Sequence, residues 1–132
     1  MTDSELLELA RQARQNAYAP YSGFAVGAAV VAGDGRCFTG ANIENASYGL
    51  ACCAERVAVF KAVSEGARQI TAVAVVADTT GPCSPCGACR QVLYEFGPEA
   101  RLILGNLKGD QRVTSVEGLL PGAFGPGDLG SR

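Results

Sequence analysis

Cysteine dominates the residues of this sequence that could do chemistry, because the 132-residue chain has six cysteines and no histidine. Without histidine, acid–base chemistry falls to carboxylates and metal binding falls to thiolates. Most of the cysteines lie in two short stretches, ACCAE (residues 51–55) and GPCSPCGAC (residues 81–89). The sequence therefore favours a site at which thiolates and a carboxylate meet.

The cysteines could instead form three disulfides, but no secretory signal supports that interpretation. The N-terminus, MTDSELLELARQAR, lacks a basic start and an apolar core, and no segment approaches the ~20 apolar residues of a membrane span. We therefore expect a cytoplasmic protein whose thiols stay reduced and serve metal binding or catalysis.

The cysteine spacing predicts a metal site of a particular kind. A helix that begins at Cys86 places Cys89 on the same face three residues later, so both sulfurs can reach one ion. Cys53 is the best third ligand, because it opens another helix whose dipole favours an anion. Residues two apart on a helix point to nearly opposite sides, so Cys53 must lie at the non-helical entry if Glu55 is to face the same ion. Three cysteines leave a fourth position for water, as in catalytic zinc sites, and Glu55 beside that water could act as base.

The rest of the sequence predicts the elements that position these residues. Capping signals and apolar periodicity predict main helices over residues 2–19, 53–65 and 86–96. Apolar runs between turn residues predict strands over residues 24–32, 36–43, 70–77, 101–106 and 111–115. The 70–77 run, ITAVAVVA, is almost wholly apolar, which is typical of a central strand covered on both faces.

This order of elements predicts one α/β domain over residues 1–132. We expect a three-layer α/β/α sandwich with a five-stranded mixed sheet, a short helical turn at VEGLL, and a frayed tail from about residue 125 to 132. Lysine and arginine together number 11 and aspartate and glutamate 13, so the net charge is −2. That charge gives no reason to expect binding to nucleic acid or to acidic membranes, and favours a small-molecule partner.

The motif CAE at Cys53–Glu55, followed by PCGAC at Pro85–Cys89, resembles the signature of the zinc-dependent cytidine and deoxycytidylate deaminases. The stretches NAYAPYSGFAVGAAV, NIENASYG, CAERVAVFKAVSEG and LLPGAF extend the resemblance, over nearly the whole chain, to the small homotetrameric cytidine deaminases. This resemblance implies hydrolysis of cytidine and 2'-deoxycytidine to uridine and 2'-deoxyuridine, with release of ammonia, in pyrimidine salvage.

The resemblance also implies roles for individual residues. It assigns one zinc ion per chain to Cys53, Cys86 and Cys89, and proton shuttling to Glu55, with zinc-activated hydroxide attacking C4 of the base. Arg56 would donate hydrogen bonds to the ligand sulfurs and so offset their charge. The resemblance places six further residues at the substrate: Phe24, Asn42, Glu44, Tyr48, Ala54 and Phe124.

The same resemblance implies active sites shared between subunits. Phe124 would reach a neighbouring subunit's site and stack over the base, while Tyr48 belongs to a loop at a subunit contact. Asn42 and Glu44 would recognise the ribose, and the carboxylate of Glu44 would repel a phosphate nearby, which favours a free nucleoside over a nucleotide.

Other interpretations of the cysteines stay open at this point. In a structural zinc module, Cys83 or Cys52 would supply a fourth ligand and exclude water. In a redox protein, CGAC would act as a thioredoxin-like pair, although Cys53 and Glu55 would then have no role. Related deaminases act on tRNA, single-stranded DNA, nucleotides or blasticidin, but NIEN favours cytidine. We assign Cys37, Cys52 and Cys83 to packing.

Overall fold

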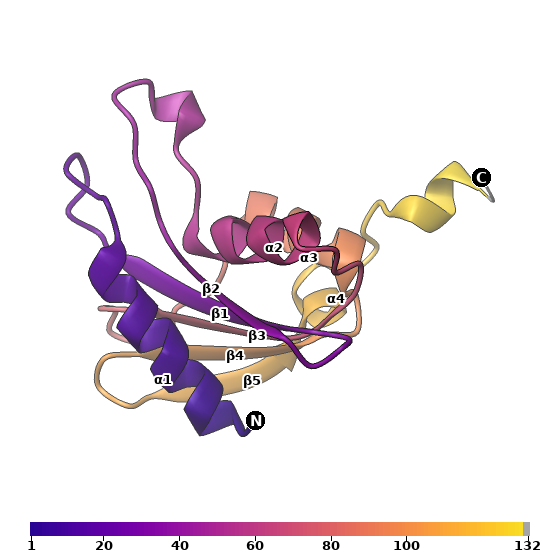
Figure 1. Cartoon of the computed structure of the whole chain (residues 1–132), viewed down its shortest axis with the longest axis horizontal. Coiled ribbons are helices and arrows are strands. Elements are labelled where there is room, and N and C mark those ends of the chain that lie inside the picture. Colours follow the sequence, from indigo (N-terminus) through magenta and orange to yellow (C-terminus); the bar gives the residue numbers. More distant parts are fainter. Residues whose placement is uncertain (131–132) are drawn as a thin grey trace.

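The computed structural model describes residues 1–130, which fold around a five-stranded sheet (Figure 1). The strands are β1 (Val26–Ala32), β2 (Cys37–Ala41), β3 (Ile70–Ala77), β4 (Arg101–Asn106) and β5 (Gln111–Ser115). Their order is β2-β1-β3-β4-β5, in which β3 and β4 are parallel and every other neighbouring pair is antiparallel. The sheet is therefore mixed, and the apolar run at residues 70–77 is its central strand, as predicted.

Helices cover both faces of the sheet, which confirms the predicted three-layer sandwich (Figure 1). On one face, α1 (Asp3–Ala13) packs Leu6 and Ala10 against β1, β3 and β4. On the other face lie α2 (Ala54–Ser64), α3 (Gly87–Phe96) and the short α4 (Val116–Leu119), which bury the larger apolar cluster against the sheet. No helix of the described residues is long and apolar enough to cross a membrane.

The first helix is shorter than the predicted range. The α-helix ends at Ala13, and a 3-10 turn, η1 (Arg14–Asn16), follows it. The chain leaves the helix axis here because the next residues join the rest of the fold: the Tyr18 amide donates to the Asn42 carbonyl at 2.9 Å, and Arg14 Nε donates to the Ala25 carbonyl at 2.9 Å. Tertiary hydrogen bonds thus end a helix that local periodicity would continue.

The predicted frayed tail contains local structure. Of residues 125–132, the structure describes 125–130, and residues Pro126–Leu129 form a 3-10 turn, η3. The Gly125 amide donates to Asp128 Oδ2 at 2.7 Å, a capping contact that the tail prediction did not include. Residues 131–132 lie outside the described part of the chain.

One glycine allows the start of α2 to lie close against the sheet. A Cβ atom added at Gly40, near the end of β2, would lie 2.6 Å from the Ala54 carbonyl oxygen and 2.6 Å from the Ala58 nitrogen. Such distances are impossible for a side chain, so only glycine permits this approach. The first turn of α2, which carries the candidate residues Cys53 to Arg56, is therefore fixed against β2.

Candidate active site

Two of the candidate cysteines occupy equivalent positions at the starts of two helices. Cys53 is the N-cap of α2 (φ −71°, ψ 155°), and Cys86 is the N-cap of α3 (φ −69°, ψ 169°). Both have extended backbone, and neither side chain caps its own helix. The predicted non-helical position of Cys53 is confirmed, and both sulfurs are free to face a shared point near two positive helix ends.

The sulfur atoms of Cys53, Cys86 and Cys89 lie within 4.8 Å of one another. The Cys53 and Cys86 sulfurs are 3.9 Å apart. A tetrahedral zinc ion with Zn–S bonds of ~2.3 Å would separate its sulfur ligands by about 3.8 Å, so this spacing fits zinc. Within the described residues, the group contains neither Cys52 nor Cys83, which disfavours a site closed by four cysteines.

The charge around Cys53 favours its thiolate form. Hydrogen bonding from Cys89, and then from Arg56, lowers the pKa of Cys53 to about 5, while the shared hydrogen bond and burial raise the pKa of Cys89. Arg56 Nη2 donates a hydrogen bond to Cys53 Sγ at 3.4 Å, the contact with a ligand sulfur that the family resemblance predicts for Arg56. Arg56 Nε is buried and has no hydrogen-bond partner. No other solvent-inaccessible side-chain nitrogen or oxygen in the described residues lacks one. A guanidinium held this way stabilises negative charge on sulfur.

Glu55 lies in the first turn of α2, directly after the Cys53 cap, and is 4% exposed. The pKa of Glu55 is raised to about 7, mainly because the carboxyl group is buried and also because the Cys53 thiolate is nearby. A carboxyl group with such a pKa can both accept and release a proton near neutral pH. The position therefore suits a general acid–base group beside the sulfurs of Cys53, Cys86 and Cys89, which form the sulfur cluster.

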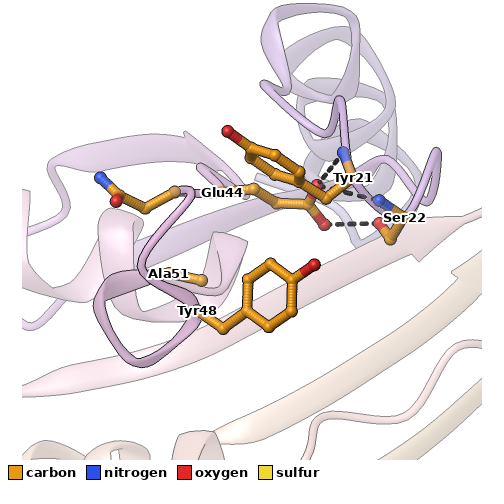
Figure 2. A pocket seen from close by; sticks show the side chains of 6 residues that line it. Tyr21, Ser22, Glu44, Tyr48 and Ala51 are labelled. Atoms are coloured by element: carbon orange, nitrogen blue, oxygen red, sulfur yellow. Dashed lines mark hydrogen bonds between the residues drawn. The ribbon is translucent and has the colours of Figure 1, made fainter.

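A hollow of about 370 Å³ lies beside the loops that precede α2. Its lining comes from residues 21–22 and 44–51, two segments that project side by side from the same edge of the sheet (Figure 1). In Figure 2, Glu44 points toward Ser22, and both of its oxygens accept hydrogen bonds: Oε1 from the amides of Tyr21 (2.9 Å) and Ser22 (3.1 Å), and Oε2 from Ser22 Oγ (2.5 Å). These bonds, led by the one from the Ser22 hydroxyl, lower the pKa of Glu44.

Of the predicted substrate residues, Glu44 and Tyr48 line this hollow, whereas Asn42 and Phe24 do not. Asn42 Oδ1 accepts from the Val26 amide at 2.8 Å, and its Nδ2 donates to the Phe24 carbonyl at 2.8 Å. Phe24 is 43% exposed and Tyr48 is 76% exposed, and the ring of Tyr48 meets Tyr21 edge to face, with 6.0 Å between centroids. Exposed aromatic faces and a fixed carboxylate suit a small, flat, hydroxylated ligand.

The structure does not bring Ala54 or Phe124 into this hollow. Ala54 is fully buried, so a substrate contact from it would use its backbone amide at the start of α2. Phe124 is 60% exposed and belongs to the C-terminal segment, which lies at the opposite end of the molecule from the loops of the hollow (Figure 1).

Sequence reasoning gave no role to Tyr21 and Ser22, which hold Glu44. The signal was present, because Pro20 and Gly23 enclose these residues and mark a turn. It could not show which carboxylate the turn would meet, because Glu44 lies more than twenty residues later in the chain.

The remaining cysteines lie apart from the sulfur cluster. Cys83 is buried in the main apolar cluster, and burial raises its pKa to about 11. Cys37 packs against the cluster beneath α1, and Cys52 forms an isolated bridge with Ile43; burial raises the pKa of both. High thiol pKa values disfavour metal binding and redox chemistry at these positions.

Comparison with known proteins identifies relatives along nearly the whole chain. Residues 1–105 match the family model described as the cytidine and deoxycytidylate deaminase zinc-binding region. The chain is 58% identical over 125 residues to a cytidine deaminase of Halalkalibacterium halodurans, a match that covers 94% of this chain and 95% of that protein. It is 47% identical over 120 residues to a cytidine deaminase of Mycobacterium tuberculosis, covering 91% of this chain and 87% of that protein.

A solved structure is similar to the fold described above. The crystal structure of cytidine deaminase from Burkholderia pseudomallei superposes with a TM-score of 0.92 at 56% sequence identity. The superposition covers 94% of this chain and all of the other. Both the family model and this structure therefore span the sulfur cluster and the hollow.

Proposed function

This chain belongs to the cytidine and deoxycytidylate deaminase family, and from that membership we propose that it is a zinc enzyme that hydrolyses cytidine to uridine and ammonia. The observation that carries the proposal is the meeting of three cysteine sulfurs from two helix starts beside the buried carboxyl group of Glu55. The three sulfurs fit a zinc ion in donor type and in spacing, and they leave one position for the nucleophile.

Zinc bound by Cys53, Cys86 and Cys89 would supply an activated water at neutral pH. Glu55 acts as general base and then as general acid. Its carboxylate takes a proton from the water, delivers it to N3 of the cytosine, and afterwards assists proton transfer to the departing amino group. Water adds at C4, the bond from C4 to the amino nitrogen breaks, and the products are uridine and ammonia. The raised pKa of Glu55 supports this two-way role.

Arg56 and the helix starts would keep the metal electrophilic. Three thiolates carry more negative charge than the two positive charges of a zinc ion, which weakens a Lewis acid. The hydrogen bond from Arg56 to Cys53 withdraws part of this charge, and the first turns of α2 and α3 add their positive dipole ends. The same contacts would help the cluster to hold zinc without histidine.

The hollow would take the nucleoside itself. Oε1 of Glu44 already accepts from the two amides, but Oε2 accepts only from Ser22 Oγ and keeps a lone pair, so the carboxylate can accept a hydrogen bond from a ribose hydroxyl. Because the pKa of Glu44 is lowered, it is charged at neutral pH and disfavours a phosphate nearby. Cytidine and 2'-deoxycytidine are therefore the proposed substrates, in a cytoplasmic salvage role, with Phe24 and Tyr48 beside the ligand.

A homotetramer with shared active sites follows from the same family pattern. The hollow is open within one chain, while Phe124 is exposed at the other end of the molecule. In a tetramer, Phe124 of one subunit would close the hollow of another by stacking over the base, with about 1 kcal/mol of stabilisation beyond its buried area. Exposed Phe124 and Tyr48 support this arrangement.

The decisive experiment measures ammonia released from four substrates. Purified zinc-loaded protein is incubated separately with cytidine, deoxycytidine, CMP and blasticidin, and kcat/KM is determined for each. We expect efficient deamination of both nucleosides and poor deamination of CMP. Comparable kcat/KM values for cytidine and CMP would contradict the role of Glu44, and activity on blasticidin alone would replace the proposed substrate.

A further inference from the structure

Arg90, one residue after the candidate ligand Cys89, is a partly buried arginine whose three hydrogen bonds all go to uncharged acceptors. Its Nε donates to the Pro85 carbonyl at 2.8 Å, its Nη1 to the Leu119 carbonyl at 2.9 Å, and its Nη2 to Ser84 Oγ at 3.1 Å. A single side chain therefore joins two segments that the chain separates by more than thirty residues.

The first of these segments immediately precedes a candidate zinc ligand. Pro85 is less than 2% exposed, so its carbonyl has no access to water. Arg90 Nε is the partner that satisfies this buried oxygen, and an unsatisfied carbonyl at such a position is costly. The backbone that delivers Cys86 to the sulfur cluster is thus held in place by Arg90.

The second segment runs from Leu119 to Phe124 and is held against α3 by further contacts. Gln91 Nε2 donates to the Phe124 carbonyl at 2.8 Å. Gly125 is buried against the ring of Tyr94, so closely that a Cβ atom on Gly125 would lie 2.6 Å from Tyr94 Cε1. Arg90 and Tyr94 are four residues apart and lie on the same face of α3. The backbone around Phe124 is therefore fixed while its ring stays exposed.

We propose that Arg90 is a positioning residue that couples the zinc-binding loop to the Phe124 segment through α3. This proposal depends on the proposed function only because zinc is assumed to be the ion that the three cysteines bind. Arg90 holds Ser84 and Pro85 in place, and through them Cys86. Arg90 and Gln91 together fix the backbone from which the Phe124 side chain projects. Loss of the Arg90 contacts then disturbs both segments at once.

Arginine is suited to this role, and lysine is not. The planar guanidinium offers five N–H donors in a fixed fork, so it can meet three acceptors in different directions at once. A lysine ammonium carries the same charge but concentrates its donors on one atom. Arg90→Lys therefore removes the geometry of the contacts and keeps the charge.

The test compares Arg90→Lys with the matched control Arg68→Lys. Arg68 also donates to two backbone carbonyls, those of Val63 (2.9 Å) and Ala67 (2.8 Å), but it lies after the far end of α2. Zinc affinity is measured by competition with a chromogenic chelator, and hydrogen exchange is measured at residues 84–86 and 119–125. We expect Arg90→Lys to lose ~10–100-fold in zinc affinity and to exchange faster in both segments, whereas the control resembles the wild type.

Gln91→Ala separates the two halves of the coupling. It should speed exchange only in residues 119–125 and leave zinc affinity unchanged, because Gln91 has no contact with residues 84–86 among the hydrogen bonds of the described chain. An Arg90→Lys protein that binds zinc as tightly as the Arg68→Lys control would overturn the proposal.

If Arg90→Lys does not fold, Ser84→Ala provides a milder test. Ser84 is exposed, and the change removes one acceptor of Arg90 while the arginine itself stays in place. It should weaken zinc binding less than Arg90→Lys does; unchanged zinc affinity and unchanged exchange at residues 84–86 would refute the role of Arg90. Failure of the wild-type chain to bind zinc would count against the proposed function, while the exchange comparison would still decide whether Arg90 couples the two segments.

Discussion

The sulfur cluster and the hollow between the two loops are built by different means within the same chain. The cluster stands on the first turns of two helices packed against the sheet, and its carboxyl group is 4% exposed. The hollow is formed by loops, and its aromatic residues Tyr21 and Tyr48 are 51% and 76% exposed. The residues proposed for chemistry stand on rigid elements, while residues proposed for recognition lie on loops.

This difference predicts how each region responds to change. Residues of the cluster depend on one another through short contacts, so a single substitution should abolish function. Under the proposed function, residues of the hollow act through exposed surfaces, so the effect of their loss should be graded. The following experiments compare the two regions, from the largest expected effect to the smallest.

Glu55→Gln should remove most of the activity and leave the zinc site in place. Glutamine has nearly the shape of glutamate but cannot shuttle a proton, so we expect kcat on cytidine to fall at least ~10²–10⁴-fold. Zinc content is measured on the same samples by elemental analysis. Glu65→Gln, an exposed change at the C-cap of the same helix, is the control and should remain fully active. A Glu55→Gln protein with near wild-type turnover would show that another group carries the proton.

Cys86→Ser should remove zinc, whereas Cys83→Ser should retain it. Cys86 belongs to the sulfur cluster, while Cys83, three residues earlier, is buried in the apolar core. The affinity loss for Cys86→Ser should exceed the ~10–100-fold typical of groups that only hydrogen-bond a ligand. In the wild type, X-ray absorption should show three sulfurs near ~2.3 Å and one lighter ligand. A shell of four sulfurs would revive the structural zinc site.

The metal-free protein should show the cost of burying Glu55 as a dependence of stability on pH. Burial raises the pKa of Glu55 from 4.5 to about 7, so between these values the unfolded chain releases a proton that the folded chain keeps. Stability therefore falls as pH rises through this window, by about 3 kcal/mol at most. The lowered pKa of Cys53 acts in the opposite sense, adding stability as pH rises from about 5 to 9.

Comparison with Glu55→Gln isolates the contribution of the carboxyl group, because both proteins contain Cys53. Urea unfolding of zinc-free, reduced protein at several pH values provides the measurement. The free energy of unfolding of the wild type, relative to the variant, should decrease from pH 4.5 to 7. A constant difference would mean that Glu55 titrates normally without the metal.

Phe124→Ala should have the smallest effect, and that effect should be complementable. In the proposed tetramer, loss of stacking would remove about 1 kcal/mol from a site whose zinc and Glu55 belong to another subunit. Co-expression of Phe124→Ala with Glu55→Gln would produce some sites with both residues intact, so the activity of mixed tetramers, identified by mass, should exceed that of either mutant alone. Activity equal to the weighted average of the two parents would mean that Phe124 serves its own subunit or none.

Local patterns were sufficient for most of the fold and for the choice of the three cysteines that the fold brings together. The strand runs, the helix starts at Cys53 and Cys86, and the i, i+3 spacing of Cys86 and Cys89 depend on contacts between residues close in sequence. Where a distant contact intervened, prediction failed: α1 ends at Ala13 because the following turn joins a remote segment.

The sequence by itself determined which residues can do chemistry here, because the absence of histidine leaves cysteine and carboxylate as the available groups. Only the tertiary structure decided which of them meet. The strand order brings Cys53 within 3.9 Å of Cys86, places Glu44 on the turn at Ser22, and lets Arg90 join two distant segments. Such meetings depend on how strands pair and how helices pack, and packing is a property of the whole core that no short stretch of sequence contains.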